Sequence, residues 1–128
     1  MTPEEIAARM REHPAMSGAQ ALVLHGSRAR GDAAASSDWD FGVLADGPVD
    51  LAALAAALTR LLGTDAVDVV DLRRASALLR YRAARDGVVL VERRDDTFRD
   101  FALEAVRFWC DAGPVIRAAQ DDVLAALG

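Results

Sequence analysis

The sequence predicts an α/β fold in which helices flank a small mixed β-sheet. Two observations predict it. Short apolar runs of strand length alternate with longer segments whose leucines recur at helical spacing, and Gly or Pro separates most of these segments. Because strands that alternate with helices usually build one layered sheet, we expect a single domain over residues 1–128. Its catalytic core is expected at about residues 19–92 and its C-terminal helices at about 95–127.

The N-terminal half is expected to contain one helix, two strands and a short connecting helix. Thr2-Pro3-Glu4-Glu5 has the residue types of a helix start, with an N-cap, a first-turn proline and early acids. The expected elements are a helix from this start to about residue 12, a strand over 20–25, a short helix from Ser27, a loop over 32–37 and a strand over 38–44.

The C-terminal half continues the alternation of strands and helices. Leucines between Leu51 and Leu62 recur at helical spacing, and Gly63 is placed to end that helix. The expected elements are this helix, a strand over 67–72, a helix over 73–86, a strand over 88–91 and two final helices over 95–111 and 114–127, separated by Gly113-Pro114.

Composition excludes several classes of protein. The net charge is −5 and every basic residue is arginine, which argues against direct nucleic-acid binding because such binding needs a basic surface. The single cysteine excludes an internal disulfide and a cysteine-based zinc site. No apolar run has the length of a membrane span and no signal-peptide pattern is seen, so we expect a cytoplasmic protein with no membrane contact.

Two aspartates at the start of the second strand are the leading functional candidates. Asp38 and Asp40 are two residues apart, so a strand places both on one face, where their charges repel unless a cation lies between them. Oxygen ligands of this kind suit Mg²⁺. Upstream, the Gly26-Ser27 turn can offer N–H groups and a hydroxyl to phosphates. The combination predicts a site for a nucleoside triphosphate.

A two-metal site usually needs a third carboxylate, and the strand over 67–72 offers Asp68 and Asp71 on opposite faces. An unpaired charge inside a strand is costly, so Asp68 is expected to need a partner such as a metal ion. Asp71 ends the strand and is expected to cap the next helix or to pair with an arginine. His25 is interpreted as a structural residue, and Trp39 as a packing residue on the other face.

The residues around these acids resemble a known family. Gly26-Ser27-Arg28-Ala29-Arg30-Gly31 followed by Ser37-Asp38-Trp39-Asp40 resembles the signature of the nucleotidyltransferase superfamily that includes DNA polymerase β. Within it, the string is similar to the minimal nucleotidyltransferases, the MntA-type antitoxins that are paired with HEPN-domain toxins. The downstream string VDVVDLRRASALLRYRAARDGVVLVER is similar to the same group. The resemblance implies a polymerase-β-like nucleotidyltransferase fold.

The resemblance also implies roles for these residues. Asp38, Asp40 and Asp68 would be the catalytic acids and would hold two Mg²⁺ ions. Gly26, Ser27 and Arg30 would bind the phosphates of ATP, and Arg28 is a weaker candidate. Members of the group transfer AMP from ATP to a tyrosine of the HEPN toxin, so we expect a protein adenylyltransferase antitoxin with that partner, in a possible oligomer with it.

Two other functions remain open on the sequence. A small-molecule nucleotidyltransferase of the aminoglycoside type would use the same chemistry, but it usually has a second helical domain for its acceptor. A non-catalytic antitoxin would neutralise its toxin by contact alone, and the presence of all three acids argues against it. Whether the arginines between Arg73 and Arg85 meet a substrate or a partner also stays open.

Overall fold

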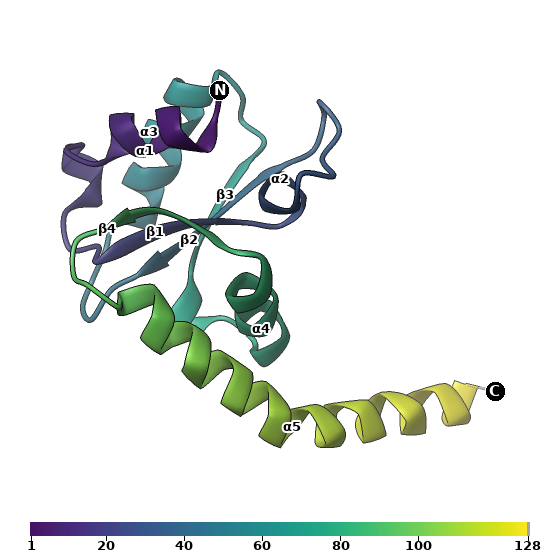
Figure 1. The fold of residues 1–128 in the computed structure, drawn as a ribbon. Coiled ribbons are helices and arrows are strands. Elements are labelled where there is room, and N and C mark those ends of the chain that lie inside the picture. The colour runs from purple at the N-terminus through teal and green to yellow at the C-terminus, as the bar shows by residue number, and fades with distance from the viewer. Residues whose placement is uncertain (128) are drawn as a thin grey trace.

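The chain folds around a four-stranded sheet that carries helices on both faces (Figure 1). The computed structural model describes residues 1–127, apart from the side chains of residues 113, 115–117, 119, 120, 123 and 127. The elements are, in chain order, α1 (Pro3–Met10), η1 (Pro14–Met16), β1 (Ala21–His25), α2 (Ser27–Arg30), β2 (Trp39–Leu44), α3 (Leu51–Leu62), β3 (Val67–Asp71), η2 (Leu72–Arg74), α4 (Ala77–Asp86), β4 (Val88–Glu92) and α5 (Thr97–Leu127).

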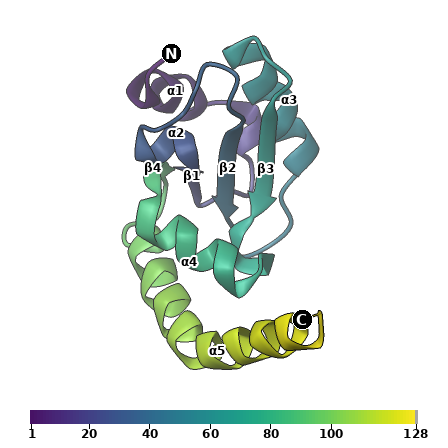
Figure 2. The ribbon, with the colours of Figure 1, turned by 90° about the vertical axis from the view of Figure 1, so that its right-hand side faces the viewer.

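The strands lie in the order β3-β2-β1-β4, which Figure 2 shows face-on. β1 runs antiparallel to β2 and to β4, whereas β2 and β3 are parallel. A parallel pair needs a crossover connection, and α3 supplies it. The sheet is therefore mixed, which confirms the predicted fold class.

Both faces of the sheet are apolar because alternate side chains of the buried strands point to opposite sides. In Figure 1, α1 and α3 cover one face, and α4 with the first half of α5 covers the other. The first face packs the larger cluster, which includes Leu22, Leu24, Phe41, Val43, Leu54 and Leu58. The second packs a smaller cluster, which includes Ala21, Val23, Leu44, Leu72, Ala83 and Phe101.

The helix boundaries follow the local signals in the sequence. Thr2 Oγ1 accepts a hydrogen bond of 3.2 Å from the N–H of Glu5, so it caps α1 as predicted. Gly63 ends α3 with φ of +69°, the left-handed conformation that glycine adopts at little cost.

The predicted helix over residues 73–86 is wrong in its first turn. The chain instead makes the 3₁₀ turn η2 and then begins α4 after Ser76. Two side chains cause the break: Asp71 caps η2 by accepting from the N–H of Arg73, and Ser76 caps α4 by accepting from the N–H of Leu79. Two successive caps end one helical segment and begin another.

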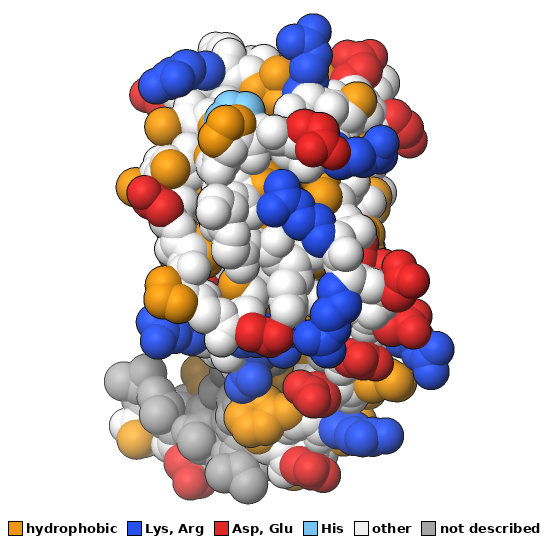
Figure 3. All heavy atoms as spheres, turned by 90° about the vertical axis from the view of Figure 1, so that its left-hand side faces the viewer, with side chains coloured by type: hydrophobic (Ala, Val, Ile, Leu, Met, Phe, Trp, Pro, Cys, Tyr) orange, Lys and Arg blue, Asp and Glu red, His pale blue; other side chains and the backbone are white. Residues whose placement is uncertain are grey.

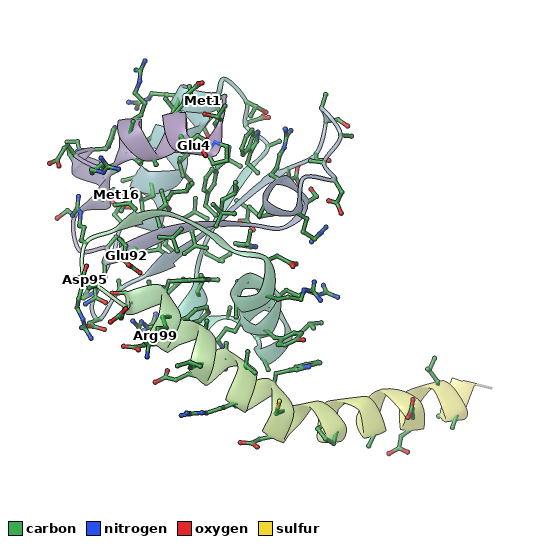
Figure 4. All side chains as sticks on the ribbon, viewed as in Figure 1. Met1, Glu4, Met16, Glu92, Asp95 and Arg99 are labelled. Carbon is green, nitrogen blue, oxygen red and sulfur yellow. The ribbon has the colours of Figure 1, made fainter. Side chains whose placement is uncertain are left out.

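The prediction of two C-terminal helices is also wrong, because α5 is one helix that contains Pro114. Proline lacks an N–H and crowds the preceding turn, so it bends a helix without always ending it. Figure 1 shows α5 bending about halfway along its length and leaving the body of the protein. At its start, Glu92 accepts a hydrogen bond of 3.1 Å from the N–H of Phe98, and Figure 4 shows Glu92 beside the first turn.

Acidic and basic side chains are interspersed on the face shown in Figure 3. That face lies at the opposite end of the sheet from the Gly26-Ser27 turn that is predicted to bind phosphates, here called the phosphate turn. Among the described residues, no helix combines the length and the hydropathy needed to cross a bilayer.

Candidate active site

Three polar residues on neighbouring strands form a row at one end of the sheet, here called the acid row. Asp40 of β2 is in register with His25 of antiparallel β1 and with Asp68 of parallel β3. Residues in register on neighbouring strands point to the same face, about 5 Å apart between backbones. The row lies on the face covered by α4 and α5, at the end of the sheet next to α2 (Figure 2).

The register separates the two acids of β3. Asp68 lies beside Asp40, whereas Asp71 pairs in register with Val43 on the other face. Asp71 Oδ1 instead accepts the N–H of Arg73 at 3.1 Å, which is the capping role predicted for it. Asp68 is exposed, so its charge does not carry the burial cost that the sequence led us to expect, and the metal partner expected for it stays a prediction. β3 is an edge strand, and the Asp68 side chain on it is open to solvent.

Asp38 directly precedes β2 and is exposed. The residue after it, Trp39, anchors the start of the strand, because its N–H donates to the carbonyl of Ala66 at 2.8 Å. Among the described residues, no group of three His, Cys, Asp or Glu side chains is gathered closely enough to hold a metal ion together. The structure therefore pairs Asp40 with Asp68 and leaves Asp38 on the exposed approach to that pair.

The chemistry of this donor set fits a hard divalent cation. Two carboxylates in register repel each other, and a cation between them would remove that repulsion. The candidate donors are carboxylate oxygens, the donor type that Mg²⁺ prefers.

The turn after β1 brings backbone against the Asp40 carboxylate. Gly26 has φ of +72° and ψ of −159°, and a β-carbon added there would collide with Asp40 Oδ2. A glycine is therefore required both by the backbone conformation and by the close approach. No side chain caps α2, and the N–H groups of Ala29 and Arg30 donate to the carbonyl of Gly26. Within the described part of the chain, the N–H groups of Ser27 and Arg28 are therefore the ones left available.

The two arginines of α2 point to different partners. Arg28 donates to the carbonyls of Ala35 and Ser37, at 3.1 and 2.8 Å, and its guanidinium lies 4.3 Å from the centre of the Trp39 ring. These contacts hold the loop between α2 and β2. Trp39 also stacks on Phe41, with ring centroids 6.2 Å apart, in agreement with its predicted packing role.

Arg30 pairs with two carboxylates. Its Nε lies 3.1 Å from Asp32 Oδ2, and its Nη1 lies 3.6 Å from Asp86 Oδ2. Its side chain is 40% exposed, so it is a surface cation at the rim of the turn with its charge already partly matched. Phosphate binding by Arg30 would require at least one of these pairs to open.

His25 also belongs to the row, and the sequence analysis did not predict that it would lie beside Asp40. Its side chain is buried and Nε2 has no hydrogen-bond partner among the described residues. Burial lowers the pKa of His25, although the nearby Asp40 carboxylate, the Phe41 backbone and the Asp68 carboxylate oppose the shift. The neutral imidazole therefore lies at the buried end of the acid row, beside Asp40. The one available signal was a polar residue at the end of an otherwise apolar strand.

A groove of about 810 Å³ lies at the other end of β2 and β3. Its lining includes Asp46, Val69, Arg73 and Leu79, and none of the acids in the row. An acidic site that binds charged phosphates need not be a deep apolar cavity, so the size of this groove does not identify it as the site of the chemistry.

Comparison with known proteins identifies the family of this chain. The family model described as polymerase beta, nucleotidyltransferase matches residues 4–96. The chain is also similar to the protein adenylyltransferase MntA of Aphanizomenon flos-aquae (strain 2012/KM1/D3), with 38% identity over 92 residues, 62% of this chain. The match spans 61% of the length of that curated relative.

Solved structures extend the similarity along the chain. A toxin-antitoxin structure with AMP-PNP superimposes with a TM-score of 0.76 and 29% identity, covering 97% of this chain and 99% of that one. The MNT antitoxin complex with the tri-AMPylated HEPN toxin of Shewanella oneidensis gives a TM-score of 0.70 and 28% identity over 95% of each chain. With the family model matching most of its length, this chain belongs to the polymerase β nucleotidyltransferase family.

Proposed function

We propose that this protein is a Mg²⁺-dependent protein adenylyltransferase that transfers AMP from ATP to a tyrosine of a HEPN-family toxin and so acts as an antitoxin. The observation that carries the proposal is the register that puts Asp40 beside Asp68, with the Gly26 turn against Asp40. The relative named MntA is a protein adenylyltransferase, and one similar antitoxin is bound to a tri-AMPylated toxin. Another similar structure contains AMP-PNP, which supports ATP as the nucleotide.

The three acids would have different roles, set by their positions in the site. Asp38, Asp40 and Asp68 would hold two Mg²⁺ ions, which when bound neutralise charge on the triphosphate and make the acceptor hydroxyl more acidic. Asp68 lies on the exposed edge strand, so it is accessible to a hydroxyl brought by another protein and would help to remove its proton.

The Gly-Ser turn would bind the phosphates that leave. The N–H groups at the start of α2 and the Ser27 hydroxyl would contact the β- and γ-phosphates, and Arg30 would add positive charge. The acceptor oxygen forms a bond to the α-phosphorus and the bond from that phosphorus to the bridging oxygen breaks. Pyrophosphate leaves, and AMP remains on the acceptor.

The acceptor is proposed to come from a separate protein because Asp68 lies on an edge strand and is exposed to solvent. After β4 the chain continues as α5, whose second half leaves the body of the protein (Figure 1). An open acid row on an edge strand suits a large acceptor that brings its own binding surface.

The test is incubation of the protein with ATP, Mg²⁺ and the product of the neighbouring gene, expected to be a HEPN-family toxin, followed by intact mass measurement of that partner. We expect a gain of one or more AMP groups. Asp38→Asn and Asp40→Asn should abolish the gain, whereas Asp71→Asn, which removes a carboxylate on the other face, should keep it. Unchanged labelling by both Asp38→Asn and Asp40→Asn would refute the proposal, and so would the absence of labelling by the unmodified protein.

A further inference from the structure

Asp86 links the phosphate turn to α4, which packs on the sheet face that also carries the acid row. It is the last residue of α4, and its carboxylate contacts arginines from two elements. Arg85 donates to it through two nitrogens, at 2.9 and 2.8 Å, while Arg30 of α2 approaches Oδ2 to 3.6 Å. The Asp86 side chain is only 13% exposed, in contrast to the 60% exposure of Asp32, the other partner of Arg30.

The two partners of Arg30 differ in what they are attached to. Asp32 lies two residues after Arg30 and moves together with the same turn. Asp86 ends a helix that is fixed on the sheet, because Ala83 one turn earlier is fully buried there. Of the two, Asp86 alone can fix the Arg30 guanidinium relative to the acid row, which also belongs to the sheet.

The charges around Asp86 leave Arg30 available to an anion. Arg85 engages Asp86 with both donors of its fork, so the carboxylate is shared between two cations. The group of Arg30, Arg85 and Asp86 therefore carries a net charge of +1, which the Asp32 carboxylate neutralises as long as its pair with Arg30 is closed. The exposed Asp32 pair is weak in water and can open when a more highly charged triphosphate arrives.

We propose that Asp86 is a positioning residue that holds the Arg30 guanidinium at the phosphate side of the active site, and that the pair of Arg30 with Asp32 opens when nucleotide binds. This inference rests on the proposed function, in which Arg30 binds the phosphates of ATP. It adds a residue from a distant element, which the Gly-Ser signature does not contain.

The experiment measures the dissociation constant of AMP-PNP with Mg²⁺ by calorimetry, together with kcat and KM for ATP in AMP transfer. Asp86→Asn keeps the shape of the side chain and removes its charge. We expect the dissociation constant and KM to rise about three- to tenfold, the scale of one or two surface charge contacts, with a smaller change in kcat. Asp86→Glu should restore part of the affinity.

Asp32→Asn is the matched control, because it removes the charge of the other carboxylate on the same guanidinium. It should leave the affinity unchanged or improve it, since it removes a competitor of the phosphates. In an Arg30→Ala background, Asp86→Asn should cause no further loss, because its effect passes through Arg30.

The outcomes separate this inference from the proposed function. If the unmodified protein fails to bind AMP-PNP with Mg²⁺, the proposed function is wrong. If it binds, but Asp86→Asn binds equally well or more tightly, Asp86 does not position Arg30. An equal loss from Asp86→Asn with and without Arg30 would also overturn the inference, because it would indicate a general structural effect.

Discussion

Replacing Gly26 with alanine tests the contact between the phosphate turn and the acid row. The change has two consequences. The Gly26 backbone has φ of +72° and ψ of −159°, a region that is nearly restricted to glycine, and another residue in this conformation loses about 1–3 kcal/mol of folding stability. The new β-carbon also meets Asp40 Oδ2, so the carboxylate must move away from Asp68. For a domain of this size, about 1 kcal/mol corresponds to roughly 4 °C in Tm, so we expect a decrease of about 4–12 °C.

Gly26→Ala should slow AMP transfer by more than its unfolded fraction can explain. A displaced catalytic group costs on the order of 100-fold in rate, which we expect for Gly26→Ala at temperatures well below its Tm. Gly31→Ala is the control, since Gly31 also has positive φ, +82°, but a β-carbon there meets nothing within 4 Å. It should lower Tm by about 4–8 °C and keep most of the activity. Equal activity losses in the two variants, measured by AMP incorporation and thermal unfolding, would refute the reasoning.

Three further predictions follow from the contacts of single side chains. Asp71→Ala removes a cap and should cost about 1 kcal/mol in chemical denaturation with AMP transfer retained, whereas Asp68→Ala should abolish transfer at little cost in stability because Asp68 is exposed. Arg28→Ala should cost about 1–2 kcal/mol and change the fluorescence of Trp39, because it removes two hydrogen bonds and the cation over that ring; an unchanged spectrum and stability would contradict this. The Arg85 guanidinium lowers the pKa of the Asp86 carboxyl below its ordinary 3.8, so this stabilisation is present above pH 3.8 and is lost as the pH falls through the lower folded pKa. The difference in unfolding free energy between the unmodified protein and Asp86→Asn should therefore shrink below about pH 4, and a constant difference would contradict the assignment.

The sheet and its acid row follow from short-range patterns. Short apolar runs in the sequence predict the strands β1 and β2, and the period-two alternation of side chains along a strand places Asp38 and Asp40 on one face. The same parity shows that Asp68 and Asp71 cannot both face the site. Choosing between them requires the register of β3 against β2, which is a tertiary feature. The resemblance indicated Asp68, and the structure places Asp68 in register with Asp40.

The incorrect expectations arose where local signals compete. Gly113-Pro114 is a common helix end, yet α5 passes through it with a bend. The successive caps at Asp71 and Ser76 divide what periodicity predicts as one helix. The Asp86 contact with Arg30 joins elements far apart in the sequence, so no local pattern could predict it.

The central claim is that acids from β2 and β3 share one divalent ion. Titration with Mn²⁺ in place of Mg²⁺, followed by electron paramagnetic resonance, measures that directly in the protein without nucleotide or partner. We predict saturable binding that is lost in Asp40→Asn and in Asp68→Asn and is retained in Asp71→Asn. Equal binding by all three variants, or loss only in Asp71→Asn, would contradict the account.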